Sequence, residues 1–420
     1  MKVLVVGSGG REHAIIKKLA ESDKVSKIYA FPGNGGMTEA EQISGNVKNI
    51  PEIVAAAEEI KADFVVVAPD DPLVLGAVDA LEEKGFKCFG PRKNAAIIEG
   101  SKIFSKNLMK KYNIPTAFYE TFEDEEKALE YLNTSKIPVV IKADGLALGK
   151  GVIIAQTREE AKEAVRSMME DKVFGESGSR IVIEEFLEGP EVSVLAFTDS
   201  KTLVPMVSSM DHKRAKDNDE GLNTGGMGTI APNPYYTKEV EKECFEKIFL
   251  PTMKAMNNEG RPFKGCLYFG LMLTADGPKV IEYNCRFGDP ETQVVLPLLE
   301  SDLFEIFEAV ADERLSETEV RFSHKSACCV IMASEGYPQK YESGFKITNN
   351  SSANVYYAGA KRDENGDILS AGGRVLGVTE TADSLEEAIE KAYKEVKNVA
   401  FENAFYRKDI GKRALEAKRG

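Results

Sequence analysis

Hydrophobic and polar side chains alternate between residues 281 and 287, which read Ile-Glu-Tyr-Asn-Cys-Arg-Phe. A period of two is typical of a β-strand, and it places Glu282, Asn284 and Arg286 on one face. Carboxylate and amide oxygens are ligands that Mg²⁺ takes, and a guanidinium can hold a carboxylate or a phosphate. An edge strand with a solvated polar face gives the same pattern, so other parts of the chain must decide between a site and a surface.

The N-terminal pattern predicts the start of a Rossmann-like unit. The apolar run Val3 to Val6 is followed by the glycine loop 7–13, Gly-Ser-Gly-Gly-Arg-Glu-His, and then by a helical pattern. The amides at the start of such a helix can bind an anion. A nicotinamide dinucleotide is not favoured, because Glu12 replaces the third glycine and the next strand ends in Pro-Gly-Asn instead of an acid. We therefore expect a phosphate or a polar substrate under this loop.

The middle of the chain predicts one long helix and a glycine hairpin. Residues 95–111 have a helical pattern that contains Lys102. A strand at 138–143 is followed by the loop 144–151, Asp-Gly-Leu-Ala-Leu-Gly-Lys-Gly, and by a second strand at 152–155. No helix follows this loop, so it is not a Walker A loop, although its amides can still cover phosphates. A flexible surface hairpin is the alternative.

Residues 211–228 predict a long polar loop with a basic triplet and several glycines. Such a loop in a compact protein is usually functional or disordered. The basic triplet and the glycines favour a mobile loop that covers an anionic ligand. A hairpin of residues 267–274 and 279–284 then ends in the alternating stretch. From residue 325, strand patterns, an Asn-Gly turn at 365–366 and a helix at 384–396 predict a small α+β domain.

Composition narrows the class of protein. At 420 residues the chain is too long for one core, and we expect about three domains. The net charge of −14 disfavours nucleic-acid and membrane-surface binding, so we expect neither partner. The six cysteines form no CxxC pair and indicate a reducing compartment, which predicts a cytoplasmic protein. No signal peptide or membrane span is visible, and the three scattered histidines disfavour a histidine-based metal site.

A larger set of motifs occurs in a characteristic order. They are the loop 7–13, residues 142–151 (Lys-Ala-Asp-Gly-Leu-Ala-Leu-Gly-Lys-Gly), 211–214 (Asp-His-Lys-Arg), 223–228 (Asn-Thr-Gly-Gly-Met-Gly) and 284–293 (Asn-Cys-Arg-Phe-Gly-Asp-Pro-Glu-Thr-Gln). Together they resemble the phosphoribosylamine–glycine ligase family of the ATP-grasp superfamily, along the whole chain. The resemblance implies an α/β and α+β multidomain fold.

The resemblance also implies where the domains divide. We expect a Rossmann-like substrate domain at 1–101, a linker helix and strand at 102–122, an ATP-grasp lid at 123–192, a central ATP-grasp domain at 193–324 and a C-terminal α+β domain at 325–420. A monomer or weak homodimer is expected.

The implied reaction joins glycine to 5-phosphoribosylamine at the expense of ATP, through glycyl phosphate, in purine synthesis. The glycine carboxylate attacks the γ-phosphoryl group, and the amine then displaces phosphate. No nucleophilic side chain is needed, so catalysis would rest on positioning and charge neutralisation. This agrees with the lack of a Ser-His or Cys-His constellation.

The resemblance implies a role for each matching residue. ATP would be bound by Lys102, Lys142, Gly149, Lys150, Gly151, Glu184, Glu185, Phe186, Leu187 and Glu191, with Glu184 and the backbone to Leu187 at the adenine and Glu191 at the ribose. Glu282 and Asn284 would bind Mg²⁺ or Mn²⁺. The reacting groups would be served by Arg286, Asp289, Lys213 and Arg214. Glycine and phosphoribosylamine would be held by Gly9, Gly10, Arg11, Glu12, His13, Asn34, Asp211, His212, Gly225, Gly226 and Arg374.

Several alternatives stay open. His13 could simply cap or pack, and Arg374 could be a solvated strand arginine. Another carboxylate-activating ATP-grasp ligase of purine synthesis, such as a carboxylase or transformylase, is the second enzyme hypothesis. A non-catalytic nucleotide-binding regulatory protein is the third, and an oxidoreductase would rest on the glycine loop alone.

Overall fold

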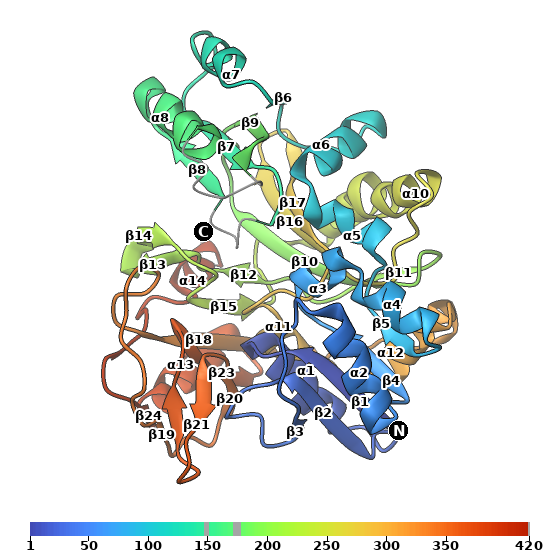
Figure 1. Cartoon of the computed structure of the whole chain (residues 1–420). Helices are drawn as coiled ribbons and strands as arrows, with labels where there is room; N and C mark the ends of the chain where they lie inside the picture. The colour runs from blue at the N-terminus through green and yellow to red at the C-terminus, as the bar shows by residue number, and fades with distance from the viewer. Residues whose placement is uncertain (147–150, 171–177, 419–420) are drawn as a thin grey trace.

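Four sheets of four or more strands carry the described chain, which comprises residues 1–146, 151–170 and 178–418 of a computed structural model. In Figure 1 the N-terminal sheet lies beside the C-terminal one, the lid sheet lies at the top, and the central sheet lies between them. This arrangement is the expected α/β and α+β multidomain class. None of the described helices combines the length and the apolar character needed to cross a bilayer.

The N-terminal sheet is parallel, in the order β3-β2-β1-β4-β5. Its strands are β1 (Lys2–Gly7), β2 (Lys27–Pro32), β3 (Glu41–Gln42), β4 (Phe64–Val67) and β5 (Lys87–Phe89). Its helices are α1 (Gly10–Leu19), α2 (Ile50–Ile60), α3 (Asp70–Leu75) and α4 (Ala77–Glu83). Because β1 is covered on both faces, residues 3–6 are apolar without interruption. The Rossmann-like prediction is confirmed.

The helix predicted at 95–111 is wrong in one respect, because it is two helices. They are α5 (Lys93–Gly100) and α6 (Lys102–Lys111). Ser101 between them is extended, and its side chain accepts a hydrogen bond from the Phe104 amide. Serine is a favoured N-cap, so Lys102 is the first residue of a helix and not an interior one.

The lid sheet is antiparallel, in the order β6-β9-β7-β8. Its strands are β6 (Tyr119–Phe122), β7 (Val139–Ala143), β8 (Val152–Ala155) and β9 (Ile181–Glu185), and its helices are α7 (Glu125–Leu132) and α8 (Arg158–Met169). The two helices and the sheet share a small apolar core of their own. The pairing of β7 with β8 confirms the hairpin, although residues 147–150 at its tip lie outside the described chain.

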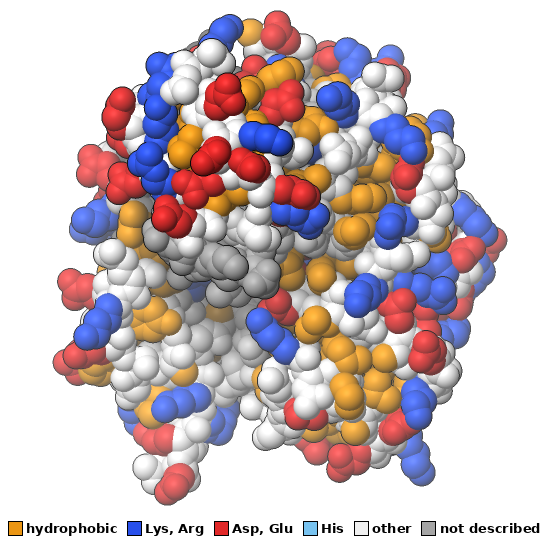
Figure 2. Space-filling model, turned by 45° about the horizontal axis from the view of Figure 1, so that its top comes forward, with side chains coloured by type: hydrophobic (Ala, Val, Ile, Leu, Met, Phe, Trp, Pro, Cys, Tyr) orange, Lys and Arg blue, Asp and Glu red, His pale blue; other side chains and the backbone are white. Residues whose placement is uncertain are grey.

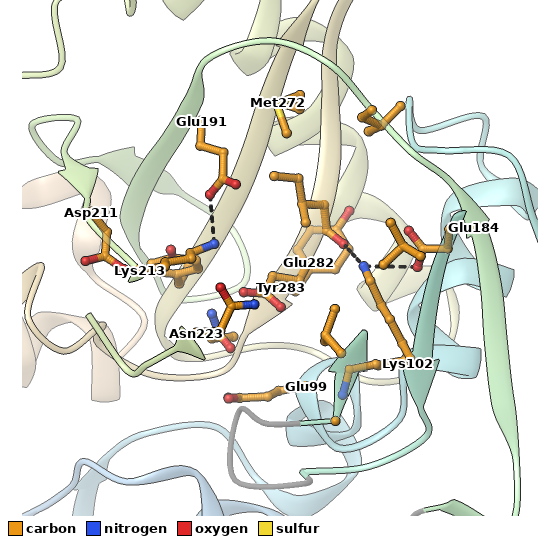
Figure 3. A pocket seen from close by; sticks show the side chains of 18 of the residues that line it. Glu99, Lys102, Glu184, Glu191, Asp211, Lys213, Asn223, Met272, Glu282 and Tyr283 are labelled. Carbon is orange, nitrogen blue, oxygen red and sulfur yellow. Dashed lines mark hydrogen bonds and ion pairs between the residues drawn. The ribbon is translucent and has the colours of Figure 1, made fainter. Parts of the chain in front are cut away.

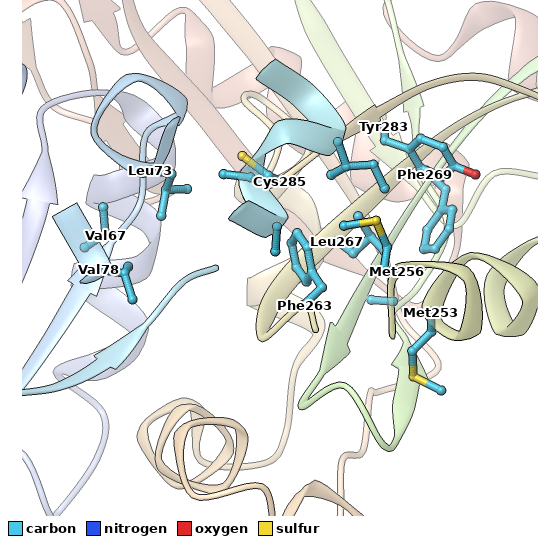
Figure 4. Close-up of a cluster of buried hydrophobic side chains, with 14 of the residues drawn as sticks. Val67, Leu73, Val78, Met253, Met256, Phe263, Leu267, Phe269, Tyr283 and Cys285 are labelled. Atoms are coloured by element: carbon cyan, nitrogen blue, oxygen red, sulfur yellow. The ribbon is translucent and has the colours of Figure 1, made fainter. Parts of the chain in front are cut away.

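The central sheet has the order β11-β10-β16-β17. Its strands are β10 (Glu191–Thr198), β11 (Leu203–Pro205), β16 (Gly265–Thr274) and β17 (Gly277–Asn284). Around it lie α9 (Lys238–Cys244), the π-helical turn Phe245–Phe249, α10 (Leu250–Asn258), α11 (Thr292–Val295), the 3₁₀ turn Leu296–Leu298 and α12 (Leu303–Ala311). One apolar cluster runs from Val67 and Leu73 of the N-terminal region to Phe269 and Tyr283 of this sheet (Figure 4). The two regions therefore share a core.

The C-terminal sheet recruits strands from the middle of the chain. Its order is β12-β15-β18-β23-β20, and β25 also pairs with β18. The strands are β12 (Met210–Asp211), β15 (Gly228–Ala231), β18 (Ser326–Ser334), β20 (Asn354–Tyr357), β23 (Arg374–Ala382) and β25 (Ala404–Phe405), with the helices α13 (Leu385–Val396) and α14 (Lys412–Ala417). The Ser384 side chain caps α13 by accepting from the Glu387 amide, so the helix predicted at 384–396 begins there.

Three two-stranded ladders complete the described part. They are β13 (Arg214–Lys216) with β14 (Glu220–Asn223), β19 (Thr348–Asn349) with β24 (Val399–Ala400), and β21 (Ala360–Arg362) with β22 (Ile368–Ser370). The β21–β22 ladder confirms the hairpin around residues 365–366. The long loop predicted at 211–228 is wrong for about half of its length, which β12 to β15 place in regular strand pairing.

Candidate functional site

A cavity of about 670 Å³ opens between the lid, the central sheet and α6. It brings together predicted residues from distant parts of the chain. Those that line it are Lys102, Lys142, Gly151, Glu184, Glu185, Phe186, Leu187, Glu191, Asp211, Lys213, Arg214, Gly225, Glu282, Asn284, Arg286 and Asp289. Figure 3 shows Glu282 between the Glu191–Lys213 pair and Glu184. We call this space the central cavity.

Strand β17 places its polar and apolar residues as the alternation predicts. Tyr283 packs into the core and borders the central cavity, and Glu282 and Asn284 line that cavity. The strand ends at Asn284, so the alternation predicted through Arg286 continues beyond it. Opposite β16 the register shifts, so that Gly270 faces Glu282 and Leu271 faces Val280. The carbonyl of the intervening Ile281 accepts a hydrogen bond from Lys142 Nζ at 3.0 Å.

Glu282 and Asn284 fit a divalent cation. Within the described ranges the Glu282 side chain forms no hydrogen bond or ion pair, although it lines the cavity beside Lys102 and Lys213. No cluster of three or more His, Cys, Asp or Glu side chains suited to a metal occurs among those residues. One carboxylate and one amide oxygen form a partial shell, which suits Mg²⁺ because that ion usually takes its other ligands from phosphates and water.

Arg286 follows the end of β17 and is anchored by a residue that sequence reasoning missed. Its Nη2 donates to Glu99 Oε1 at 2.8 Å and to Asn284 Oδ1 at 3.4 Å. The other oxygen of Glu99 accepts from the Cys285 amide at 2.7 Å. Burial raises the pKa of the Glu99 carboxyl even though the Arg286 charge opposes this. Arg286 Nε is buried without a hydrogen-bond partner among the described residues.

Glu184 lies between two lysines at the lid end of the central cavity. Its Oε2 is 3.0 Å from Lys106 Nζ and its Oε1 is 3.0 Å from Lys142 Nζ. Burial alone would raise the pKa of the Glu184 carboxyl, but the two ammonium groups bring it below its ordinary value. Burial lowers the pKa of Lys106 to about 8. Glu184 is therefore a buried, ionised acceptor.

Two further lysines of the site form hydrogen bonds with neighbouring segments. Lys102 Nζ donates to the Gly145 carbonyl at 2.7 Å, which connects α6 to the start of the hairpin loop 144–151. Burial lowers the pKa of Lys102. Lys213 Nζ donates to Glu191 Oε2 at 2.8 Å, and the Glu191 charge raises the pKa of Lys213. Arg214 Nη1 donates instead to the Gly221 carbonyl of the β13–β14 ladder.

The acidic end of the cavity contains Asp211 and Glu291. Burial and the Glu291 charge raise the pKa of Asp211 well above its ordinary value. Gly226, with φ of +115°, passes so close that a Cβ there would lie 2.6 Å from Asp211 Oδ1. Tyr268 donates from its hydroxyl to Glu291 Oε1 at 3.0 Å. The buried Glu291 and the half-buried Asp211, both near Lys213, suit a substrate with an ammonium group.

The glycine loop and Arg374 lie outside the cavity lining but meet it at Asp289. Asp289 Oδ2 accepts from the Arg11 amide at 3.2 Å, and Oδ1 is 3.6 Å from Arg374 Nη2. Arg374 Nη1 also donates to the carbonyls of Gly225 at 2.7 Å and Asp289 at 2.8 Å. Arg374 is thus a bound strand arginine and not a solvated one.

The remaining predicted substrate residues have structural partners. Glu12 accepts from the Gly9 amide at 2.6 Å and from Arg11 Nε at 2.6 Å. His13 is buried, and its Nδ1 accepts from the Tyr357 amide. Asn34 donates to the carbonyls of Ser8 and Tyr357. His212 is buried against Gly228 and Gly411, and burial lowers its pKa to about 4.

Sequence reasoning missed part of the cavity lining. Those residues include Glu99, Lys106, Tyr268 and Arg413, whereas Asn223 and Glu291 belong to the motifs 223–228 and 284–293 that carry the family resemblance. Lys106 could have been found, because it lies four residues after Lys102 and so on the same face of a helix. Gly149 and Lys150 lie outside the described residues.

Models of one family match the chain over three consecutive segments. They are described as the phosphoribosylglycinamide synthetase N domain at residues 1–99, its ATP-grasp (A) domain at 100–292 and its C domain at 327–413. The chain belongs to this phosphoribosylglycinamide synthetase family. Relatives named phosphoribosylamine–glycine ligase include one from Caldanaerobacter subterraneus subsp. tengcongensis, 49% identical over 98% of this chain and 99% of the relative. Another, from Listeria monocytogenes, is 49% identical over 99% of this chain and all of the relative.

Solved structures agree with membership of the phosphoribosylglycinamide synthetase family. The phosphoribosylamine–glycine ligase of Thermotoga maritima has a TM-score of 0.83 at 34% identity, covering 98% of this chain and 100% of that one. The biotin carboxylase domain of Hydrogenobacter thermophilus 2-oxoglutarate carboxylase has a TM-score of 0.74 at 18% identity, covering 96% and 91%. The second likeness shows the shared ATP-grasp fold alone.

Proposed function

We propose that this chain ligates glycine to 5-phosphoribosylamine with ATP, giving glycinamide ribonucleotide, ADP and phosphate. The observation that carries the proposal is the family match along the chain, together with the central cavity that gathers the residues the family motifs assign. The glycine carboxylate oxygen attacks the γ-phosphorus, and the bond to the bridging oxygen of ADP breaks. The amine then attacks the carbonyl carbon, phosphate leaves, and the amine loses a proton.

The ATP end of the proposal uses the lid side of the cavity. Glu184 and the backbone as far as Leu187 receive the base, and Glu191 receives the ribose hydroxyls. Lys102 and Lys142 neutralise phosphate charge, and because Lys142 is buried and Lys102 half-buried, their attraction is screened less than it would be in water. Glu282 and Asn284 hold Mg²⁺ or Mn²⁺. When bound, the cation supplies charge neutralisation at the phosphates.

The acceptor end of the proposal uses the opposite side. Arg286 receives the glycine carboxylate or the acyl phosphate, since its fork can bind either oxygen pair. Asp211 beside Glu291 receives the glycine ammonium. Phosphoribosylamine lies toward Asp289, the glycine loop and Arg374. The donors there include amides at the start of α1, which suit a phosphate.

The proposed specificity for glycine rests on steric exclusion. Attraction of one methylene group contributes only about 1–3 kcal/mol. A pocket too small for any side chain therefore selects glycine by steric clash with larger amino acids, and not by stronger binding of glycine. Asp211 itself is held from behind by Gly226, where an added Cβ would lie 2.6 Å from Asp211 Oδ1. Enclosure by the lid also keeps water away from the acyl phosphate.

The test is phosphate release with each substrate omitted in turn. The proposal expects release only when ATP, a divalent cation, glycine and phosphoribosylamine are all present, with formation of glycinamide ribonucleotide. Release driven by formate or bicarbonate would instead indicate another carboxylate-activating ligase. Absence of release with every substrate present would favour a non-catalytic nucleotide binder. We also propose that the protein is cytoplasmic and that it is a monomer or a weak homodimer. Light scattering tests the oligomeric state.

A further inference from the structure

Lys106 is a buried cation that the proposed chemistry does not use. It lies one helical turn beyond Lys102 on α6, and its side chain is about 3% exposed. Its Nζ is 3.0 Å from Glu184 Oε2 and donates to Thr116 Oγ1 at 2.7 Å. Thr116 in turn donates to the Val280 carbonyl of β17 at 2.7 Å. A continuous chain of polar contacts therefore fixes one oxygen of Glu184 to the central sheet.

The other oxygen of Glu184 is left for a ligand. Oε1 is buried and accepts no hydrogen bond of good geometry in the described part of the chain, although Lys142 Nζ lies 3.0 Å away. Lys142 directs a hydrogen bond to the Ile281 carbonyl instead. Glu184 lines the central cavity together with Glu185, Phe186 and Leu187. A buried carboxylate oxygen whose neighbouring cation directs its hydrogen bond elsewhere gains stability when a further donor reaches it.

The charge state of this carboxylate decides which base it can receive. An ionised carboxylate only accepts hydrogen bonds, whereas a protonated one can also donate. Adenine presents an amino group at C6, and a 6-oxo purine presents a carbonyl oxygen at the same place. If a 6-oxo purine were bound, its carbonyl oxygen and the Glu184 carboxylate would face each other as two acceptors, and neither would have a donor. A buried site of this kind discriminates strongly against such a ligand.

We infer that Lys106 is a specificity-determining residue, which orients Glu184 and holds it as an acceptor so that the cavity takes a 6-amino purine nucleotide and rejects a 6-oxo purine nucleotide. The inference rests on the proposed binding of the ATP base at Glu184. It adds a role for a residue that touches the base only through another side chain, so Lys106 is a positioning residue and not a catalytic one. The effect is directed at the base and not at glycine or the amine.

The variant Lys106→Met keeps the length and apolar stem of the side chain but removes the charge. Glu184 then loses one of its two cations and the contact that orients Oε2. The matched control is Lys110→Met, one turn further along α6, because Lys110 is exposed and also lies over the ring of Tyr119. A third variant, Glu184→Gln, replaces the acceptor with an amide that can turn either an acceptor or a donor toward the base.

The measurement is the ratio of kcat/KM with ATP to kcat/KM with ITP, followed by phosphate release so that the base does not affect detection. ITP differs from ATP at C6 and in the proton on N1, and the N1 difference cancels when variants are compared. We expect Lys106→Met and Glu184→Gln to lower the ratio at least about tenfold, with the KM for glycine within about twofold of wild type. Lys110→Met should keep the wild-type ratio.

Four outcomes decide the inference. A wild-type ratio in Lys106→Met overturns it, and so does an unchanged ratio in folded Glu184→Gln. If Lys106→Met binds but does not turn over, the ratio of Kd values for ADP and IDP takes the place of the kinetic ratio. If that variant does not fold, Lys106→Gln takes its place, because it also removes the charge and is judged by the same ratio. Failure of the proposed function is a different result: wild-type protein would then release no phosphate from ATP with glycine and phosphoribosylamine present.

Discussion

Replacing Glu99 tests whether the end of β17 is held in place from the N-terminal region. Glu99 receives the Cys285 amide at 2.7 Å and Arg286 Nη2 at 2.8 Å, and it is 9% exposed. Glu99→Ala removes both contacts and leaves the largely enclosed Arg286 guanidinium with Asp70 as the strongest remaining opposite charge. Breaking a buried ion pair in this way destabilises a protein by about 3–5 kcal/mol. We expect a loss of that size in the free energy of unfolding.

Glu99→Gln separates the two contributions. Its amide oxygen can still accept from the Cys285 amide or from Arg286, so only the charged part of the interaction is lost. Charged hydrogen bonds contribute about 1.5–3 kcal/mol against about 0.5–1.5 for neutral ones, which predicts a loss of about 1–2 kcal/mol. Urea unfolding and glycine-dependent phosphate release are the assays. Activity should fall with Glu99→Gln because Arg286 is less firmly placed.

The control for Glu99 is an arginine–glutamate pair at the surface. Arg92 pairs with Glu82, and the two side chains are 63% and 29% exposed. Such pairs contribute about 0–1 kcal/mol, so Glu82→Gln should change stability by less than about 1 kcal/mol. If Glu99→Ala is no worse than Glu82→Gln, or if Glu99→Gln is as damaging as Glu99→Ala, the anchoring role is refuted.

Three further outcomes are expected. Glu282→Ala should abolish metal-dependent turnover while the fold survives, because this carboxylate has no structural partner in the described chain; full activity at saturating Mg²⁺ would contradict the metal assignment. Arg374→Ala should raise the KM for phosphoribosylamine by about tenfold, from the loss of a charged hydrogen bond, with ATP affinity kept; an unchanged KM for the amine would remove Arg374 from the site. Glu313 pairs with Lys201 and Lys264, which lower its pKa to about 2. Because the pKa of Glu313 is lower in the folded than in the unfolded protein, its ion pairs stabilise the fold above about pH 4.5, and this stabilisation is lost as the pH falls toward 2. Glu313→Gln should therefore have a smaller free energy of unfolding than wild type at pH 6 and about the same one near pH 2. A difference that does not change with pH would contradict this reasoning.

Local patterns sufficed where one physical constraint dominates. The β-branched run of β1, the glycine loop and the alternation in β17 each follow from burial on known faces, so their elements were predicted correctly. The break at Ser101 was missed because Lys93 to Lys111 keeps a helical pattern throughout, and only the capping hydrogen bond divides it. The β13–β14 ladder was missed because its residues are polar and largely exposed, so no periodicity marks it.

Partnerships between distant residues could not be predicted in the same way. Glu99 lies on an apolar helix whose sequence gives no indication that it reaches Cys285 and Arg286. The family motifs brought Arg374 and the glycine loop to one site, but Asp289 as their meeting point emerges only from the packing of α1, α11 and β23. Acidic residues on the surface are similarly uninformative, since Lys, Arg, Asp and Glu intermingle on the face shown in Figure 2.

The strands β12 and β15 have a consequence for dissecting the protein. β15 pairs along its length with β18, residue for residue from Gly228 opposite Val330 to Ala231 opposite Ala327. A truncation after residue 324 would therefore expose the hydrogen-bonding edge of β15. The separated C-terminal fragment would lack β12 and β15, so the edge of β18 that pairs with β15 would be exposed as well. Exposed apolar edges of this kind promote aggregation. The segments 210–231 and 325–420 therefore have to be kept in the same polypeptide when the protein is expressed or engineered.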